Sequence, residues 1–155
     1  MNEMMVDQNA PVRGSAEIHI AAPLQVVWEV LTDFESWPTW NKSVTKMRID
    51  GPLAPGTKFH WKAGTNIAST IQEVSPRTRI VWTGRTLVIK AVHVWLIQTE
   101  KSGVLVQTEE SFPGLLPRVF ASRMRRLLRN SLEQGLECLR HESETRLNKP
   151  VSALR

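Results

Sequence analysis

The feature that most constrains the fold is a series of short strand-like segments that ends in one long amphipathic helix. After about residue 43, apolar and polar residues alternate in short segments bounded by turn residues such as Pro, Gly and Ser. Short turns between successive strands predict a meander, and therefore an antiparallel sheet. From Leu116 to about Thr145 the apolar spacing becomes that of a helix.

Helical signals follow the first predicted strand. Pro23 suits the first turn of a helix. Pro38 disfavours helical geometry at Trp37, so we expect the first helix to end there and a second short helical turn to carry Trp40. The predicted strands span residues 15–21, 43–49, 57–63, 66–74, 79–84, 87–99 and 104–112.

This order of elements predicts an α+β fold. A curved antiparallel sheet of about seven strands would wrap around one long C-terminal helix, with two short helices after the first strand. Strong curvature would leave a cavity between sheet and helix. In a chain of 155 residues we expect one domain over residues 14–145, a disordered leader at 1–13 and a flexible tail at 146–155.

The composition argues against several classes of protein. One cysteine, Cys138, excludes an intramolecular disulfide and a multi-cysteine zinc site. The sequence has no stretch of 18 apolar residues and no apolar core of a signal peptide near its start. Metal-binding, phosphate-loop and dinucleotide motifs are absent as well. We therefore expect a cytoplasmic protein with no metal and no cofactor.

The polar side of the long helix is basic. Arg125, Arg126 and Arg129 fall there together with Glu133 and Glu137. A net charge of +5 supports only weak attraction to anions, so we interpret this face as solvated, with no nucleic-acid site and no stable membrane insertion. Docking to a lipid surface or a protein is the alternative. The opposite side carries the residues expected to be buried: Leu116, Val119, Phe120, Met124, Leu127, Leu128, Leu132 and Leu139, with the small residues Ser131 and Gly135.

Five segments are distinctive in combination: APLQVVWEVLTDFESWPTWN, LAPGTKF, TIQEVSPRTRIVWTG, AVHVWLI and EESFPGLLPR. Over roughly residues 14–143 the chain resembles the polyketide cyclase/dehydrase-like (SRPBCC) family of the START-like helix-grip superfamily. The resemblance implies a helix-grip fold with a deep apolar cavity for a hydrophobic small molecule. It leaves the function open, because members include ligand carriers, cyclases, ubiquinone-binding proteins and chaperone co-activators.

Two ionisable residues are predicted to face this cavity. On the last strand Glu109 suits the solvent face, so Glu110 points inward; on the preceding strand Lys90 suits solvent, so His93 points inward. A two- or four-residue turn within residues 100–103 keeps both on one face, whereas a three-residue turn with a bulge would separate them. With a two- or four-residue turn, the two residues come directly or nearly opposite each other. The Cβ atoms of directly opposite residues are about 4.5–5.5 Å apart.

The predicted ligand is an apolar molecule, cyclic or aromatic in character, held by a carrier or sequestering protein. A cyclase or dehydratase acting on a polyketide-like substrate is the alternative, and the protein is expected to be a monomer or a homodimer. His93 and Glu110 are the candidates for a ligand anchor, a general acid/base pair or a structural pair. The predicted cavity lining is Phe59, Trp61, Trp82, His93, Trp95, Glu110, Phe112 and Met124.

Overall fold

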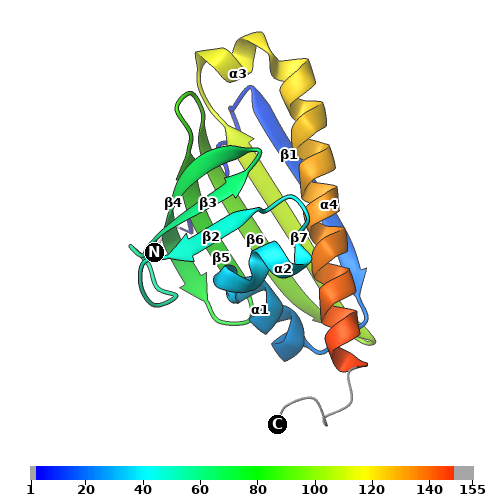
Figure 1. Cartoon of the computed structure of the whole chain (residues 1–155). Coiled ribbons are helices and arrows are strands. Elements are labelled where there is room, and N and C mark those ends of the chain that lie inside the picture. Colours follow the sequence, from blue (N-terminus) through cyan, green and yellow to red (C-terminus); the bar gives the residue numbers. More distant parts are fainter. Residues whose placement is uncertain (1–2, 149–155) are drawn as a thin grey trace.

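Seven antiparallel strands form one sheet in the order β1-β7-β6-β5-β4-β3-β2, and a long helix lies along one face of it (Figure 1). The computed structural model describes residues 3–148. The predicted α+β class and the long C-terminal helix are confirmed. The strands are β1 (Val12–Ile20), β2 (Lys46–Ile49), β3 (Lys58–Ala63), β4 (Thr65–Ser75), β5 (Arg79–Arg85), β6 (Lys90–Glu100) and β7 (Gly103–Phe112).

The short helices connect β1 to β2. Pro23 is the N-cap of the first of them, as its position predicts. Trp37 has helical φ and ψ and begins α2, although it precedes a proline. The expected break at Trp37 is therefore wrong, and burial of its side chain accounts for the helical geometry. These elements are α1 (Leu24–Thr32), the 3₁₀ turn η1 (Phe34–Ser36) and α2 (Trp37–Trp40).

The C-terminal helix is divided into two pieces at Phe120, whose φ of −106° and ψ of 24° interrupt it. The pieces are α3 (Leu115–Val119) and α4 (Ala121–Leu147), where one helix from Leu116 was predicted. Only part of its apolar side is covered. Leu128, Leu132 and Leu139 are buried, as predicted, together with Leu136.

The other predicted core positions at the start of this helix are exposed: Leu116, Val119, Phe120 and Leu127. Figure 1 gives the reason for the first three, since α3 lies at the far end of the sheet. In the first turns of α4, Ala121 and Met124 pack against the cluster around Val12 of β1, but Leu127 is not part of that cluster. The helical period identified the apolar side of the helix correctly. It could not tell how far the sheet extends beneath that side.

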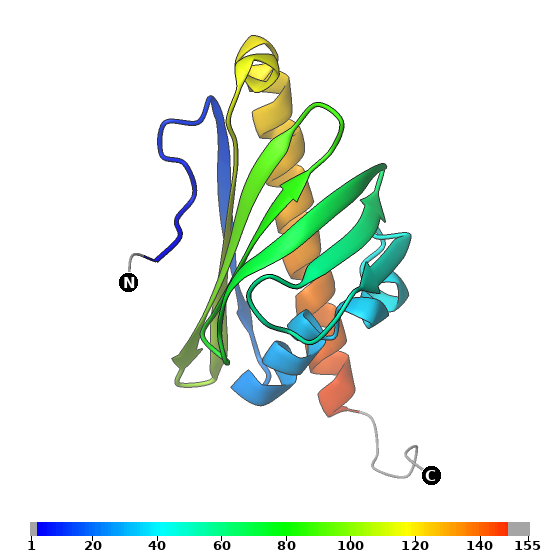
Figure 2. The ribbon, with the colours of Figure 1, turned by 90° about the vertical axis from the view of Figure 1, so that its left-hand side faces the viewer.

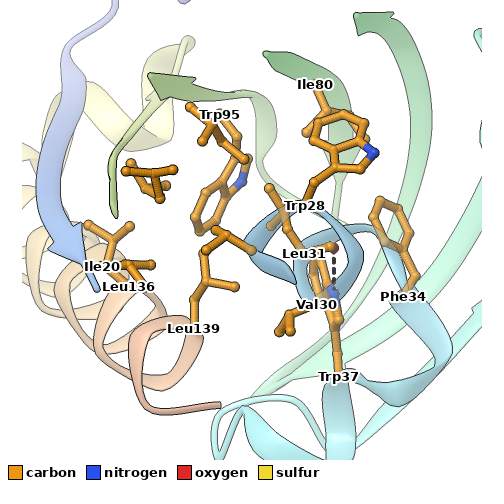
Figure 3. Close-up of a cluster of buried hydrophobic side chains, with 14 of the residues drawn as sticks. Ile20, Trp28, Val30, Leu31, Phe34, Trp37, Ile80, Trp95, Leu136 and Leu139 are labelled. Atoms are coloured by element: carbon orange, nitrogen blue, oxygen red, sulfur yellow. Dashed lines mark hydrogen bonds between the residues drawn. The ribbon is translucent and has the colours of Figure 1, made fainter. Parts of the chain in front are cut away.

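The main core lies between the sheet, α1 and the second half of α4. Figure 3 shows its members, among them Ile20, Leu31 and Leu136, converging from all three elements. The indole Nε1–H of Trp37 donates to the carbonyl oxygen of Leu31 at 2.9 Å. This bond satisfies a donor that burial would otherwise leave unpaired.

The N-terminal segment lies along the other face of the sheet, away from α4 (Figure 2). Val6 is buried against Val81 and Val94, and the backbone N–H of Asp7 donates to Ser111 Oγ at 3.0 Å. The expectation of a disordered leader is therefore wrong for the described residues from 3 onward. The apolar outer positions of β5 and β6 explain the contact, because Val6 covers them.

The predicted tail falls mostly outside the described residues. Of residues 146–155, the structure describes the last turn of α4 and Asn148. Arg146 Nε lies 2.8 Å from Glu142 Oε1, one turn earlier on the helix. Residues 149–155 lie outside the described part of the chain.

Candidate functional site: an apolar cavity with a polar pair

A cavity of about 330 Å³ lies between the sheet and α4. Seven of the eight predicted residues line it: Trp61, Trp82, His93, Trp95, Glu110, Phe112 and Met124. The eighth, Phe59, is fully buried in the main core. Its ring packs edge-on against Phe34 and Trp82, with centroids 4.8 and 5.6 Å away, so the prediction that it lines the cavity is wrong.

The small residues on α4 border open space. Ser131 and Gly135 both line the cavity, as their place on the apolar side of the helix predicts. A Cβ added at Gly135 would meet no atom within 4 Å, apart from its own neighbouring backbone. The helix is therefore not packed tightly onto the sheet at this point, and the cavity continues beneath it.

Indole rings form much of the cavity wall. Trp37, Trp61, Trp82 and Trp95 all line it. The rings of Trp82 and Trp95 are stacked at 30° with centroids 6.3 Å apart, and Trp37 meets Trp61 edge-on at 5.9 Å. These contacts hold several flat apolar surfaces in place around one space, which suits a ligand that contains a ring.

His93 and Glu110 meet across the ladder between β6 and β7. They are directly opposite each other in the register, and Glu100 pairs with Gly103, so the turn has two residues. His93 Nδ1 lies 3.7 Å from Glu110 Oε2. The prediction that both side chains share the cavity face is confirmed, and the two-residue turn is the reason.

Hydrogen bonds determine the tautomer of His93. Its Nε2 lies 2.7 Å from Thr108 Oγ1, and the same hydroxyl donates to the carbonyl oxygen of Val94 at 3.2 Å. A hydroxyl has one proton, so Thr108 must accept from His93, and Nε2 carries the hydrogen. Nδ1 then presents a lone pair on the side of Glu110.

Burial makes both partners neutral. It lowers the pKa of His93 from 6.5 to about 3, and it raises the pKa of Glu110 from 4.5 to about 8. The dominant cause is the loss of water around the charged forms. Near pH 7 the cavity therefore holds a protonated carboxyl group beside a neutral imidazole, not an ion pair.

Two polar atoms of the cavity-lining side chains lack a partner within the described residues: His93 Nδ1 and Trp95 Nε1. An unpaired buried donor or acceptor costs about 1–3 kcal/mol. The carboxyl group of Glu110 is the more accessible polar group, with 17% of its side chain exposed. Together these atoms make one polar region in a predominantly apolar space.

Several lining residues are not apparent in the strand pattern. Asn41, Ser43 and Val44 come from the segment between α2 and β2, Arg85 is the last residue of β5, and Thr86 begins the β5–β6 turn. A period-two pattern identifies the faces of strands but not the loops that close over them. The sequence signal in this region is the pair of tryptophans on either side of Pro38, of which Trp37 lines the cavity.

The described residues offer no other chemistry-bearing cluster of this kind. Within residues 3–148, no three His, Cys, Asp or Glu side chains are grouped so that they could hold a metal ion. No helix in that range is long and apolar enough to cross a lipid bilayer.

The sequence of residues 11–144 matches the family model described as polyketide cyclase / dehydrase and lipid transport. The chain belongs to this family. No curated protein matches its sequence. Membership of the family agrees with the predicted resemblance and covers every residue of the cavity.

Solved structures share the fold at low sequence identity. A hypothetical protein, jhp0584 from Helicobacter pylori, is 18% identical with a TM-score of 0.74, over 85% of this chain and 86% of that one. The di-domain ARO/CYC StfQ from the steffimycin biosynthetic pathway is 14% identical with a TM-score of 0.76, over 89% of this chain and 52% of StfQ. A START superfamily protein from Mycobacterium smegmatis is 14% identical with a TM-score of 0.67, over 86% and 97%.

Proposed function

We propose that this member of the family binds an apolar, ring-containing small molecule with one hydroxyl or carbonyl group, and acts as a carrier or sequestering protein. The observation that carries the proposal is the cavity itself, walled by indole rings and holding the neutral polar region of His93 and Glu110. Its volume of about 330 Å³ is at the lower end of the range of ligand sites, about 300–1,000 Å³. That size favours a compact ligand.

The polar region supports a ligand oxygen. The protonated carboxyl of Glu110 can donate a hydrogen bond, and the lone pair on His93 Nδ1 can accept one. A hydroxyl group on the ligand could use both, and a carbonyl group the first. A purely apolar ligand would leave these groups unpaired, which disfavours it.

Filling the cavity tests the proposal. Gly135→Phe places a ring in the space beneath α4, and Gln134→Phe is the matched control because the neighbouring side chain is exposed. Native mass spectrometry of the freshly purified proteins should find a small molecule with the wild type and with Gln134→Phe but not with Gly135→Phe. Equal retention by both variants would refute binding in this cavity.

Replacing the carboxyl group of Glu110 tests whether this residue recognises the ligand or only supports the fold. With an oxygen-bearing ligand identified in that way, Glu110→Gln should fold and weaken binding by about 1–3 kcal/mol, the cost of one mismatched buried polar group. Unchanged affinity would mean that Glu110 is a structural group only.

A second candidate is a cyclase or dehydratase acting on a polyketide-like substrate. The observation that favours it is the same pair, because a neutral carboxyl group and an unprotonated imidazole are a potential acid and base in one mostly apolar cavity. In that case a poly-ketone substrate should be converted to a ring product, and Glu110→Gln should reduce turnover by about 10²-fold or more with little change in binding. Binding without turnover would leave the carrier function.

A further inference from the structure

Exposed apolar side chains gather around one end of the molecule. The β5–β6 turn carries Leu87, which is fully exposed, and Val88 at 65%. In both views the turn lies at the same end as α3 and the start of α4 (Figures 1 and 2). The exposed residues on those helices are Leu115 (76%), Val119 (66%), Phe120 (52%) and Leu127 (59%). Large apolar side chains that are exposed together mark an interaction surface.

This apolar group adjoins the mouth of the cavity. Leu127 lines the cavity from α4, and Thr86 and Ile89 line it from the β5–β6 turn. The exposed residues therefore form a rim, comprising residues 87–88, 115–120 and 127, around one side of the opening.

The two chain segments that carry the rim contain arginines and no acids. Between Phe112 and Leu132 the sequence has five arginines and no Asp or Glu, and no acid occurs from residue 74 to residue 99. All five arginines are exposed. Arg123 precedes Leu127 by one helical turn and so lies on the same side of α4 as the rim. Arg125 points elsewhere, because its guanidinium donates to the carbonyl oxygen of Pro11 at 2.9 and 2.7 Å.

We propose that the rim docks onto an anionic lipid bilayer, with Leu87, Val119 and Phe120 entering the interface and Arg123 and Arg126 contacting lipid phosphates. Apolar side chains beside arginines are the combination that a headgroup–acyl boundary accommodates. A second copy of the chain is disfavoured as the occupant, because it would bring two groups of five arginines together. A nucleic acid is disfavoured because the centre of the surface is apolar. The proposal rests on this surface alone and does not depend on the identity of the cavity ligand.

Vesicle flotation of the full chain tests the electrostatic part. The wild type should float with vesicles of phosphatidylcholine mixed with phosphatidylglycerol and much less with phosphatidylcholine alone. Arg123→Glu/Arg126→Glu should reduce the association at least about tenfold. Lys58→Glu/Lys101→Glu is the matched control, with the same change of charge at exposed positions away from the rim. Failure of the wild type to float, or an equal loss in the control, would overturn the proposal.

A second double variant tests whether the apolar side chains of the rim contribute to membrane binding. Leu87→Ser/Val119→Ser keeps the charge and alters two exposed side chains, and it should reduce vesicle association by about tenfold or more. Leu147→Ser, at the other end of α4, is the control and should bind like the wild type. No effect of the double variant would mean adsorption by charge only and would refute insertion of the rim. A wild-type dimer in sedimentation that this variant dissociates would assign the rim to a second copy instead.

Discussion

Replacement of Glu110 by Gln should make the protein's stability respond differently to pH. In the wild type, burial holds the pKa of Glu110 near 8, above its ordinary 4.5, so the folded state keeps the proton that the unfolded chain loses. The raised pKa means that stability is highest, for this group, below pH 4.5 and is lost as the pH rises towards 8. Each pH unit in this window favours unfolding by about 1.4 kcal/mol, or about 5 kcal/mol in total.

His93 contributes with the opposite sign. Its lowered pKa means that stability is fully present above 6.5 and is lost as the pH falls towards 3. The two effects offset each other between pH 4.5 and 6.5, so this pair gives a stability plateau there and a decline on both sides. Glu110→Gln removes the decline above pH 6.5 and the plateau as well, so that only the loss of stability from pH 6.5 down to 3 caused by His93 remains.

The measurement is urea unfolding, followed by tryptophan fluorescence at several pH values from about 5 to 8. The free energy of unfolding of Glu110→Gln minus that of the wild type should increase with pH by about 1.4 kcal/mol per unit. Glu109→Gln, which removes a carboxyl group from the other face of β7, is the control. A difference that stays flat with pH, or a similar slope in the control, would refute the assignment of Glu110 as a buried neutral acid.

Three further predictions concern stability. Gly103→Ala should destabilise the protein by more than about 2 kcal/mol in urea unfolding, because φ is +140° and the new Cβ would lie 2.1 Å from the carbonyl oxygen of Ile20. Gly135→Ala should stabilise it by about 0.5–1 kcal/mol in the same assay, since the site is helical and open; destabilisation would show that the space beneath α4 is filled. Arg79→Met should lower the free energy of unfolding by about 3 kcal/mol and speed proteolysis within residues 3–11, because Arg79 is buried, lies 3.1 Å from Glu73 and donates to the carbonyl oxygen of Met4. Unchanged cleavage would show that Arg79 does not hold this segment.

Local patterns were sufficient for much of the fold. Short segments bounded by turn residues identified all seven strands, and the polar residues Lys90 and Glu109 indicated the inward parity of His93 and Glu110, because side chains alternate strictly along a strand. The short turns implied antiparallel neighbours, and the helical period placed Ser131 and Gly135 on the side that borders the cavity. These features depend on chain geometry over a few residues, which is why the sequence alone could determine them.

The tertiary structure determined which side chains are covered by other segments of the chain. The pattern on β6 is apolar on both faces, and only the folded chain shows that Val6 covers the outer one. Phe59 has inward parity like Trp61, yet contacts with Phe34 and Trp82 place it in the core. The helical period gave Leu127 and Leu128 the same side of α4, but Leu128 packs against Val12 whereas Leu127 borders the open cavity and stays exposed. Burial depends on segments that are distant in sequence, so no local period could determine it.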